Sequence, residues 1–212
     1  MNFIEGKRVA FVAQTPVIEG KVLGEEIDGF DFVFRSNIFP VTNTADFGSR
    51  CDIISCTKDN FRFLRGHSVP NIVTYDALKG YREDVKGRKV YYISEIARKA
   101  IREWAAAKYG VDIIDATSGL IAFFLCHVYG AVQIKMFGFS GYQDAKMNVV
   151  NHGDAEHYTS DYIDTIGTRE YIHSVDMRNY DCHNFDAHNT VWRRLLIDRL
   201  VEMDNYSKQY FR

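Results

Sequence analysis

Apolar residues along the chain are concentrated in short continuous runs, and amphipathic segments lie between several of them. The runs RVAFVA, DFVFRS, CDIISC, NIVTYD, KVYYIS and VQIKMFGF begin at Arg8, Asp31, Cys51, Asn71, Lys89 and Val132. Their apolar residues are mostly consecutive instead of alternating, which is typical of strands buried on both faces of a parallel sheet.

Three longer segments predict helices, at residues 95–109, 118–129 and 187–203. The first begins after a favourable N-cap, Ser94, and is followed by Gly110, a common residue at a helix end. Alternation of strands and helices is the βαβ pattern. The sequence therefore predicts an α/β fold with a Rossmann-like, open, mostly parallel sheet that carries helices on both faces.

A polar segment, residues 140–182, separates the last predicted strand from the last predicted helix. It is rich in Asp, His, Asn and Tyr and has no strong period. A connection of this length in a compact domain is usually a lid or a substrate-contacting region, and a solvated loop is the alternative.

Composition excludes several classes of protein. The chain has 212 residues, of which 46% are hydrophobic and 14% aromatic, enough to bury the core of a single domain. The formal net charge is -2 and no long basic block occurs, so no nucleic acid is expected as a partner. A small phosphorylated ligand needs only local charge and is compatible with this balance.

The predicted location is cytoplasmic. No transmembrane segment is predicted, because no run is long and apolar enough to span a bilayer, and the N-terminus lacks a signal peptide. The cysteines are few and have no CxxC spacing, as expected for reduced thiols. They are Cys51, Cys56, Cys126 and Cys182. The oligomeric state is left open.

Polar residues follow two of the predicted strands. Gln14 and Thr15 follow the first, while Arg35 and Ser36 end the second and Asn37 follows it. Ligands of an open parallel sheet bind beyond the carboxyl ends of its strands, so Asn37 is expected to face a ligand and Arg35 to brace the turn. The acidic run from Gly24 to Asp28 is expected to be a helical turn, with Gly24 and Gly29 as hinges.

A third candidate lies before the second predicted helix. There Thr117, Ser118 and Gly119 form a turn whose main-chain N–H groups could bind an anion. Ordinary helix capping is the alternative.

Taken together, these stretches resemble the sialylmotifs of family 29 sialyltransferases. VAFVAQTPVIEGKVLGEEIDGFDFVFRSN, with DFGSR from Asp46, looks like the large motif, and DATSGLIAFFLCHVYGAVQIKMFGF from Asp115 looks like the small motif. EHYTSD from Glu156 and HNFDAH from His183 are similar to the two short motifs. The Thr-Ser-Gly order also resembles the bacterial family 42 sialyltransferases, whereas the Gly-Glu-Glu-Ile-Asp run favours family 29.

The resemblance implies a GT-A-like variant of the fold and an activity. Members transfer sialic acid from a CMP-sugar donor to a hydroxyl of a glycan acceptor with inversion, without a cofactor or an obligatory metal. A related ulosonic acid such as Kdo is the alternative for the sugar. The implied organisation is one glycosyltransferase domain, residues 1–212. Its parts are a nucleotide-sugar-binding core (1–139), a lid and acceptor region (140–182) and a C-terminal catalytic-motif helix (183–212).

The resemblance also implies roles for particular residues. Gln14 and Asn37 would contact the nucleotide, with Thr15 beside them. Thr117, Ser118 and Gly119 would surround the phosphate, ribose and carboxylate of the donor. His183 would be the general base on the acceptor hydroxyl, and His157 would assist departure of the phosphate, with His173 as its rival. An imidazole suits these tasks because it titrates near neutral pH.

The sequence departs from the family pattern at several positions. His188 stands where the last motif has Glu, with Asp186 nearby, and Ala13-Gln14 replaces Gly-Asn after the first strand. The two cysteines that join the long motifs in animal enzymes are Val9 and Ala131 here, which suits a reducing compartment. With no anchor or stem before the first motif, a cytosolic bacterial or viral version is expected.

Two other classes remain open from the sequence. One is a catalytically inactive module of the same fold that binds a CMP-sugar, another nucleotide-sugar or a carbohydrate, which His188 in place of Glu would favour. The other is a metal site formed by Cys182, His183 and His188, with His152, although the spacing matches no standard structural zinc pattern.

Overall fold

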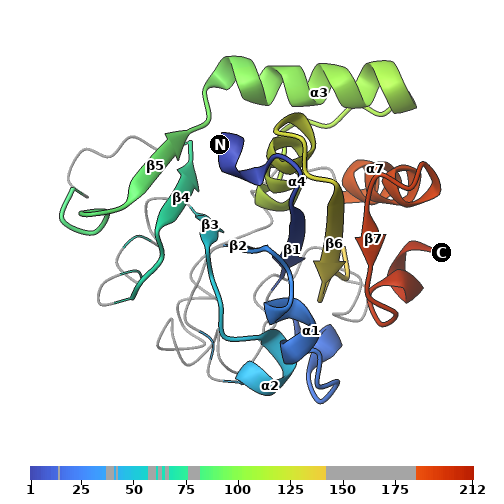
Figure 1. Cartoon of the computed structure of the whole chain (residues 1–212). Helices are drawn as coiled ribbons and strands as arrows, with labels where there is room; N and C mark the ends of the chain where they lie inside the picture. The colour runs from blue at the N-terminus through green and yellow to red at the C-terminus, as the bar shows by residue number, and fades with distance from the viewer. Residues whose placement is uncertain are drawn as a thin grey trace, which may run out of the picture.

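The computed structural model describes residues 1–13, 15–36, 41, 43–56, 61, 64, 67–75, 82–141 and 185–212. Its centre is a seven-stranded sheet in the order β5-β4-β3-β2-β1-β6-β7, shown in Figure 1. Every neighbouring pair of strands is parallel. The strands are β1 (Arg8–Val12), β2 (Phe32–Ser36), β3 (Ile53–Ser55), β4 (Asn71–Thr74), β5 (Lys89–Tyr92), β6 (Gln133–Phe137) and β7 (Glu202–Met203). The predicted open α/β sheet is confirmed.

Helices pack on both faces of the sheet, as predicted. They are α1 (Gly24–Asp28), α2 (Thr44–Phe47), α3 (Glu95–Tyr109), α4 (Ser118–Val128) and α7 (Phe185–Ile197), with the short 3₁₀ turns η1 (Asn2–Ile4), η2 (Pro16–Ile18) and η6 (Lys208–Phe211). Val9 and Phe11 of β1 are buried in a core that also contains residues of α3, α4 and α7. Ala10 and Val12 are buried in a second core with residues of α1 and α2. Figure 1 shows α1 and α2 side by side, apart from α3, α4 and α7.

The last helix and strand differ from the prediction. A single helix was expected over 187–203, but α7 ends at Ile197 and β7 follows it. Arg199 has φ +56°, and the Leu200 N–H donates to the Leu195 carbonyl oxygen at 2.9 Å. This is the geometry of a Schellman helix end, where glycine is the usual residue. Because Arg199 occupies this position instead of glycine, no residue in the sequence indicated where the helix ends.

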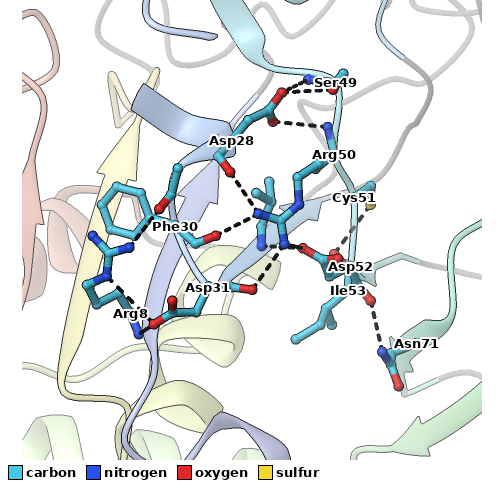
Figure 2. Close-up of polar contacts among 12 residues, drawn as sticks. Arg8, Asp28, Phe30, Asp31, Ser49, Arg50, Cys51, Asp52, Ile53 and Asn71 are labelled. Atoms are coloured by element: carbon cyan, nitrogen blue, oxygen red, sulfur yellow. Dashed lines mark hydrogen bonds and ion pairs between the residues drawn. The ribbon is translucent and has the colours of Figure 1, made fainter. Parts of the chain in front are cut away.

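Figure 2 shows a polar network that joins the connection before β2 to the connection before β3. The Arg50 guanidinium donates to the carbonyl oxygens of Asp28, Phe30 and Asp31, and pairs with Asp52 at 2.8 Å. The Asp28 carboxylate accepts the N–H and the hydroxyl of Ser49, both at 2.8 Å. Burial acts to raise the pKa of Asp28, but these hydrogen bonds outweigh it and the pKa is lowered.

Arg35, at the end of β2, makes a similar brace inside the protein. Its side chain is fully buried, and its Nε donates to the Arg50 carbonyl oxygen at 2.7 Å. Arg35 was expected to brace the turn at the end of its own strand, and among the described residues it braces the loop between α2 and β3. The DFGSR stretch therefore contributes to the fold through buried hydrogen bonds.

Candidate functional site

The order in which the chain adds strands to the sheet reverses between β1 and β6, and this switch point defines the candidate site. From β1 the chain runs outward on one side through β2, β3, β4 and β5, and then continues on the other side with β6 and β7. Connections that leave two adjacent parallel strands in opposite directions leave a crevice between them, and ligands of open α/β sheets bind there.

The ends of β1 and β6 are held together at the bottom of this crevice. The Thr15 hydroxyl donates to the Gly138 carbonyl oxygen at 2.5 Å, and the Ala13 N–H donates to the Phe137 carbonyl oxygen at 2.9 Å. Thr15 is buried. Gly138 has φ +71°, and a Cβ there would lie 2.9 Å from the Ala13 carbonyl oxygen, so only glycine fits. The structure thus places Thr15 at the site, with its hydroxyl proton donated to a main-chain carbonyl oxygen.

A turn after β7 closes the other side of the β6 end. The buried Asp204 carboxylate accepts the N–H groups of Gly138 at 3.0 Å and Ser207 at 2.9 Å. The Ser207 hydroxyl donates to Asp204 and accepts the Phe139 N–H at 2.8 Å. Sequence reasoning missed both residues, because 187–203 was expected to be one continuous helix. Their only signal is the short polar segment DNYS after that helix.

The N-terminus of α4 points its main-chain donors at this region. The Thr117 side chain accepts the Leu120 N–H at 3.4 Å, so Thr117 is the N-cap. No acceptor among the described residues pairs with the N–H groups of Ser118 and Gly119. A Cβ on Gly119 would lie 3.2 Å from the Phe139 ring and 3.4 Å from the Phe11 ring. The glycine therefore lets the helix begin directly against the ends of β1 and β6, with two donors available for an anion.

Ion pairs hold the segment that leads into this turn. Asp115 accepts from Arg98 Nη2 at 2.5 Å and from Arg98 Nε at 3.2 Å, and Arg102 lies 3.7 Å from the same carboxylate. Asp115 also accepts the Ala116 N–H at 2.9 Å. Because both arginines lie on α3, the turn at Thr117 is anchored to a long helix. The bidentate pairing of Arg98 with the Asp115 carboxylate also fixes the relative orientation of the two side chains.

His188 contributes to the site, although the sequence marked it as a departure from the motif and as a candidate metal ligand. It lies on α7, is 2% exposed, and its Nε2 accepts the Thr117 N–H at 3.4 Å. His188 shares an inward face with Val191, Trp192 and Leu195, all buried. This i, i+3, i+4, i+7 spacing was the signal that could have placed it in the interior.

Of the predicted donor-binding residues, Thr15 contacts Gly138 and Gly119 lies against Phe139, so Thr15 and the turn of Thr117, Ser118 and Gly119 both lie at the end of β6. Gln14, Asn37, His157 and His183 lie outside the described residues. The same holds for His173, Cys182 and His152. Within the described ranges, no three His, Cys, Asp or Glu side chains come together as a metal site would require. No helix in the described part of the chain is long and apolar enough to cross a membrane.

Comparison with solved structures relates this fold to sialyltransferases. A crystal structure of a mammalian sialyltransferase superposes with a TM-score of 0.58 and 16% identity, covering 94% of this chain and 69% of the other. The same kind of enzyme in complex with Gal-beta-1-3GalNAc-ortho-nitrophenol gives 0.57 and 18%, with the same coverage. The sialyltransferase CstII from Campylobacter jejuni, in complex with the substrate analogue CMP-3FNeuAc, gives 0.54 and 12%, covering 95% and 88%.

Searches by sequence give no match. No family model matches the chain, and no curated protein matches it. The fold is therefore that of the sialyltransferase structures, mammalian and bacterial alike, and nearly the whole chain takes part in it. At these identities the likeness concerns the fold alone.

Proposed function

We propose that this protein is an inverting glycosyltransferase that moves sialic acid, or a related ulosonic acid, from a CMP-sugar to a hydroxyl of a glycan. The observation that carries the proposal is the α4 N-terminus, with the N–H groups of Ser118 and Gly119 at the crevice between β1 and β6. This anion site stands in a fold shared with sialyltransferases over 94% of the chain.

The α4 turn suits the phosphate of CMP. In the reaction the bond between the anomeric carbon of the sugar and the phosphate oxygen breaks, and both electrons leave with CMP. Negative charge therefore grows on the phosphate, and fixed N–H donors at a helix N-terminus stabilise charge that develops there. Arg98 and Asp115 hold the turn in place before the reaction begins.

The acceptor hydroxyl must lose its proton as its oxygen bonds to the anomeric carbon. His183, two residues before the start of α7 in the sequence, is the proposed base, and His157 is proposed to assist the leaving phosphate. A positioned acid or base typically contributes about 10²- to 10⁴-fold to the rate. The proton ends on His183, the sugar on the acceptor, and CMP is released.

Isothermal titration with nucleotides tests the donor. CMP and CDP are expected to bind at least tenfold more tightly than UMP and AMP, and equal affinities would refute the proposal. A screen of CMP-sugars, followed by CMP release with and without simple galactosides, then identifies the sugar and the acceptor class.

The His183→Ala variant tests the base. Transfer is expected to fall by at least 100-fold, in line with the usual contribution of a positioned base, while CMP affinity stays within twofold of wild type. His127→Ala, on the exposed side of α4, is the matched control and keeps full transfer. CMP binding with no donor turnover in the wild type would identify a binding module instead.

A further inference from the structure

The hydrogen bond between His188 and Thr117 connects α7 to the turn at the start of α4. The main-chain N–H of Thr117 donates to His188 Nε2 at 3.4 Å, and the two residues are 71 positions apart in the sequence. His188 is 2% exposed, so the accepting ring lies in the interior. This hydrogen bond links α7 directly to the candidate anion site.

The direction of the bond sets the chemical form of the imidazole. A ring nitrogen that accepts a hydrogen bond carries no proton, so this bond requires the imidazole tautomer with its proton on Nδ1. It thus supplies an acceptor beside the helix N-terminus without adding a charge there.

Packing holds His188 at the correct place for this bond. One turn further along α7, Trp192 packs against Phe139 with ring centroids 5.7 Å apart and against Phe123 with centroids 6.0 Å apart. Phe139 in turn packs against the position of Gly119. The aromatic contacts fix the distance between the two helices, and the imidazole acts on the main chain of the turn itself.

We propose that His188 is a positioning residue of the donor site, a role that rests on the function proposed above. By accepting the Thr117 N–H, it fixes the main chain at the N-cap of α4. The neighbouring N–H groups of Ser118 and Gly119 then stay oriented toward the crevice and bind the donor phosphate. Loss of the bond leaves a partly buried N–H without an acceptor and lets the turn rotate.

Two polar substitutions separate this role from simple packing. The amide of Gln can place its oxygen near the position of Nε2, whereas Asn reaches only as far as Nδ1. We expect His188→Gln to bind CMP within twofold of wild type, and His188→Asn to bind it about 3- to 10-fold more weakly, the range of one hydrogen bond. His127→Gln on the exposed side of α4 is the control and leaves CMP affinity unchanged.

Nuclear magnetic resonance gives a readout that a packing defect alone would not produce. In ¹H–¹⁵N spectra without nucleotide, the Thr117 amide proton is expected to move upfield in His188→Asn and to stay near its wild-type position in His188→Gln. Equal Thr117 shifts in the two variants, or equal CMP affinities, would overturn the positioning role. If wild type itself does not bind CMP, the proposed function fails, while the Thr117 signal still decides whether the bond exists.

Discussion

The Arg35 guanidinium donates from Nη2 to the carbonyl oxygen of Phe47 at 2.6 Å, inside the protein between β2 and the loop after α2. The same nitrogen lies 3.1 Å from the Gly48 carbonyl oxygen. Burial lowers the pKa of Arg35, since desolvation disfavours the charge. The strand thus ends in a polar residue because the buried carbonyl oxygens of the loop after α2 need a side chain that donates several hydrogen bonds.

Replacing Arg35 by Met should therefore destabilise the protein strongly. The variant keeps the apolar volume but leaves the carbonyl oxygens of Phe47 and Arg50 without their donor, at an expected loss of about 3–5 kcal/mol of unfolding free energy. Urea unfolding followed by circular dichroism measures the loss. Arg194→Met, at an exposed position of α7, should change it by less than about 0.5 kcal/mol. A loss below about 1 kcal/mol at Arg35 would mean that the loop does not need the guanidinium.

Two glycines at the ends of α1 should respond differently to alanine. A Cβ on Gly24 would lie 2.1 Å from the Thr44 carbonyl oxygen, so α1 and α2 would have to separate. A Cβ on Gly29 would lie 3.3 Å from the Glu25 carbonyl oxygen, and Gly29 has φ -76°, which alanine adopts readily. Gly24→Ala is expected to cost about 3 kcal/mol or more, and Gly29→Ala about 1 kcal/mol or less. Thermal unfolding of the two variants provides the comparison, and equal costs would contradict the close approach of the helices.

Gly119→Ala should weaken nucleotide binding more than it weakens the fold. The added Cβ meets the Phe139 ring at 3.2 Å, and a side chain can yield by a few tenths of an ångström. The start of α4 is then displaced from the crevice, so we expect CMP affinity to fall at least fivefold while the melting temperature drops by only a few degrees. Titration calorimetry and thermal unfolding on the same samples test this. Unchanged CMP affinity would place the phosphate elsewhere.

Alkaline pH should destabilise the protein through its buried thiols. Burial raises the pKa of Cys126 from 9.0 to about 12, so the folded state keeps a proton that the unfolded state loses. The stabilisation is present below about pH 9 and is lost as the pH rises toward 12, on the order of 1 kcal/mol by pH 10. Urea midpoints between pH 8 and pH 10.5 measure this slope.

A substitution assigns the slope to one thiol. Cys126→Ala should be less stable at every pH, because it leaves a cavity, yet its stability should decline less steeply with pH than that of wild type. Identical slopes would show that the Cys126 thiol ionises alike in both states.

The parts of the fold that follow from local chemistry were predictable from the sequence. Six strands and α3 were predicted because apolar runs and caps such as Ser94 act within a few residues. β7 was not, because two residues form no pattern and the preceding helix ends at Arg199 without a glycine.

The candidate site was predictable where it consists of a turn and a helix start. Thr117, Ser118 and Gly119 were identified because hydroxyls and glycine before an apolar helix indicate a cap. Asp204 was missed, and the contact of His188 with the turn was not predicted, because their partners, Gly138 and Thr117, are 66 and 71 residues away. Sequence patterns describe neighbours along the chain, whereas such contacts arise only once the whole sheet is assembled.

The turn from Asp204 to Ser207 has a consequence for biosynthesis. The N–H groups of Gly138 and Phe139 donate to Asp204 and Ser207 of this turn. A ribosome-bound chain that has not yet released residue 207 can pair β1 to β6, yet it leaves the wall of the ligand site unfinished. The proposed nucleotide binding should therefore appear only after residue 207 has emerged, later than the pairing of β1 with β6.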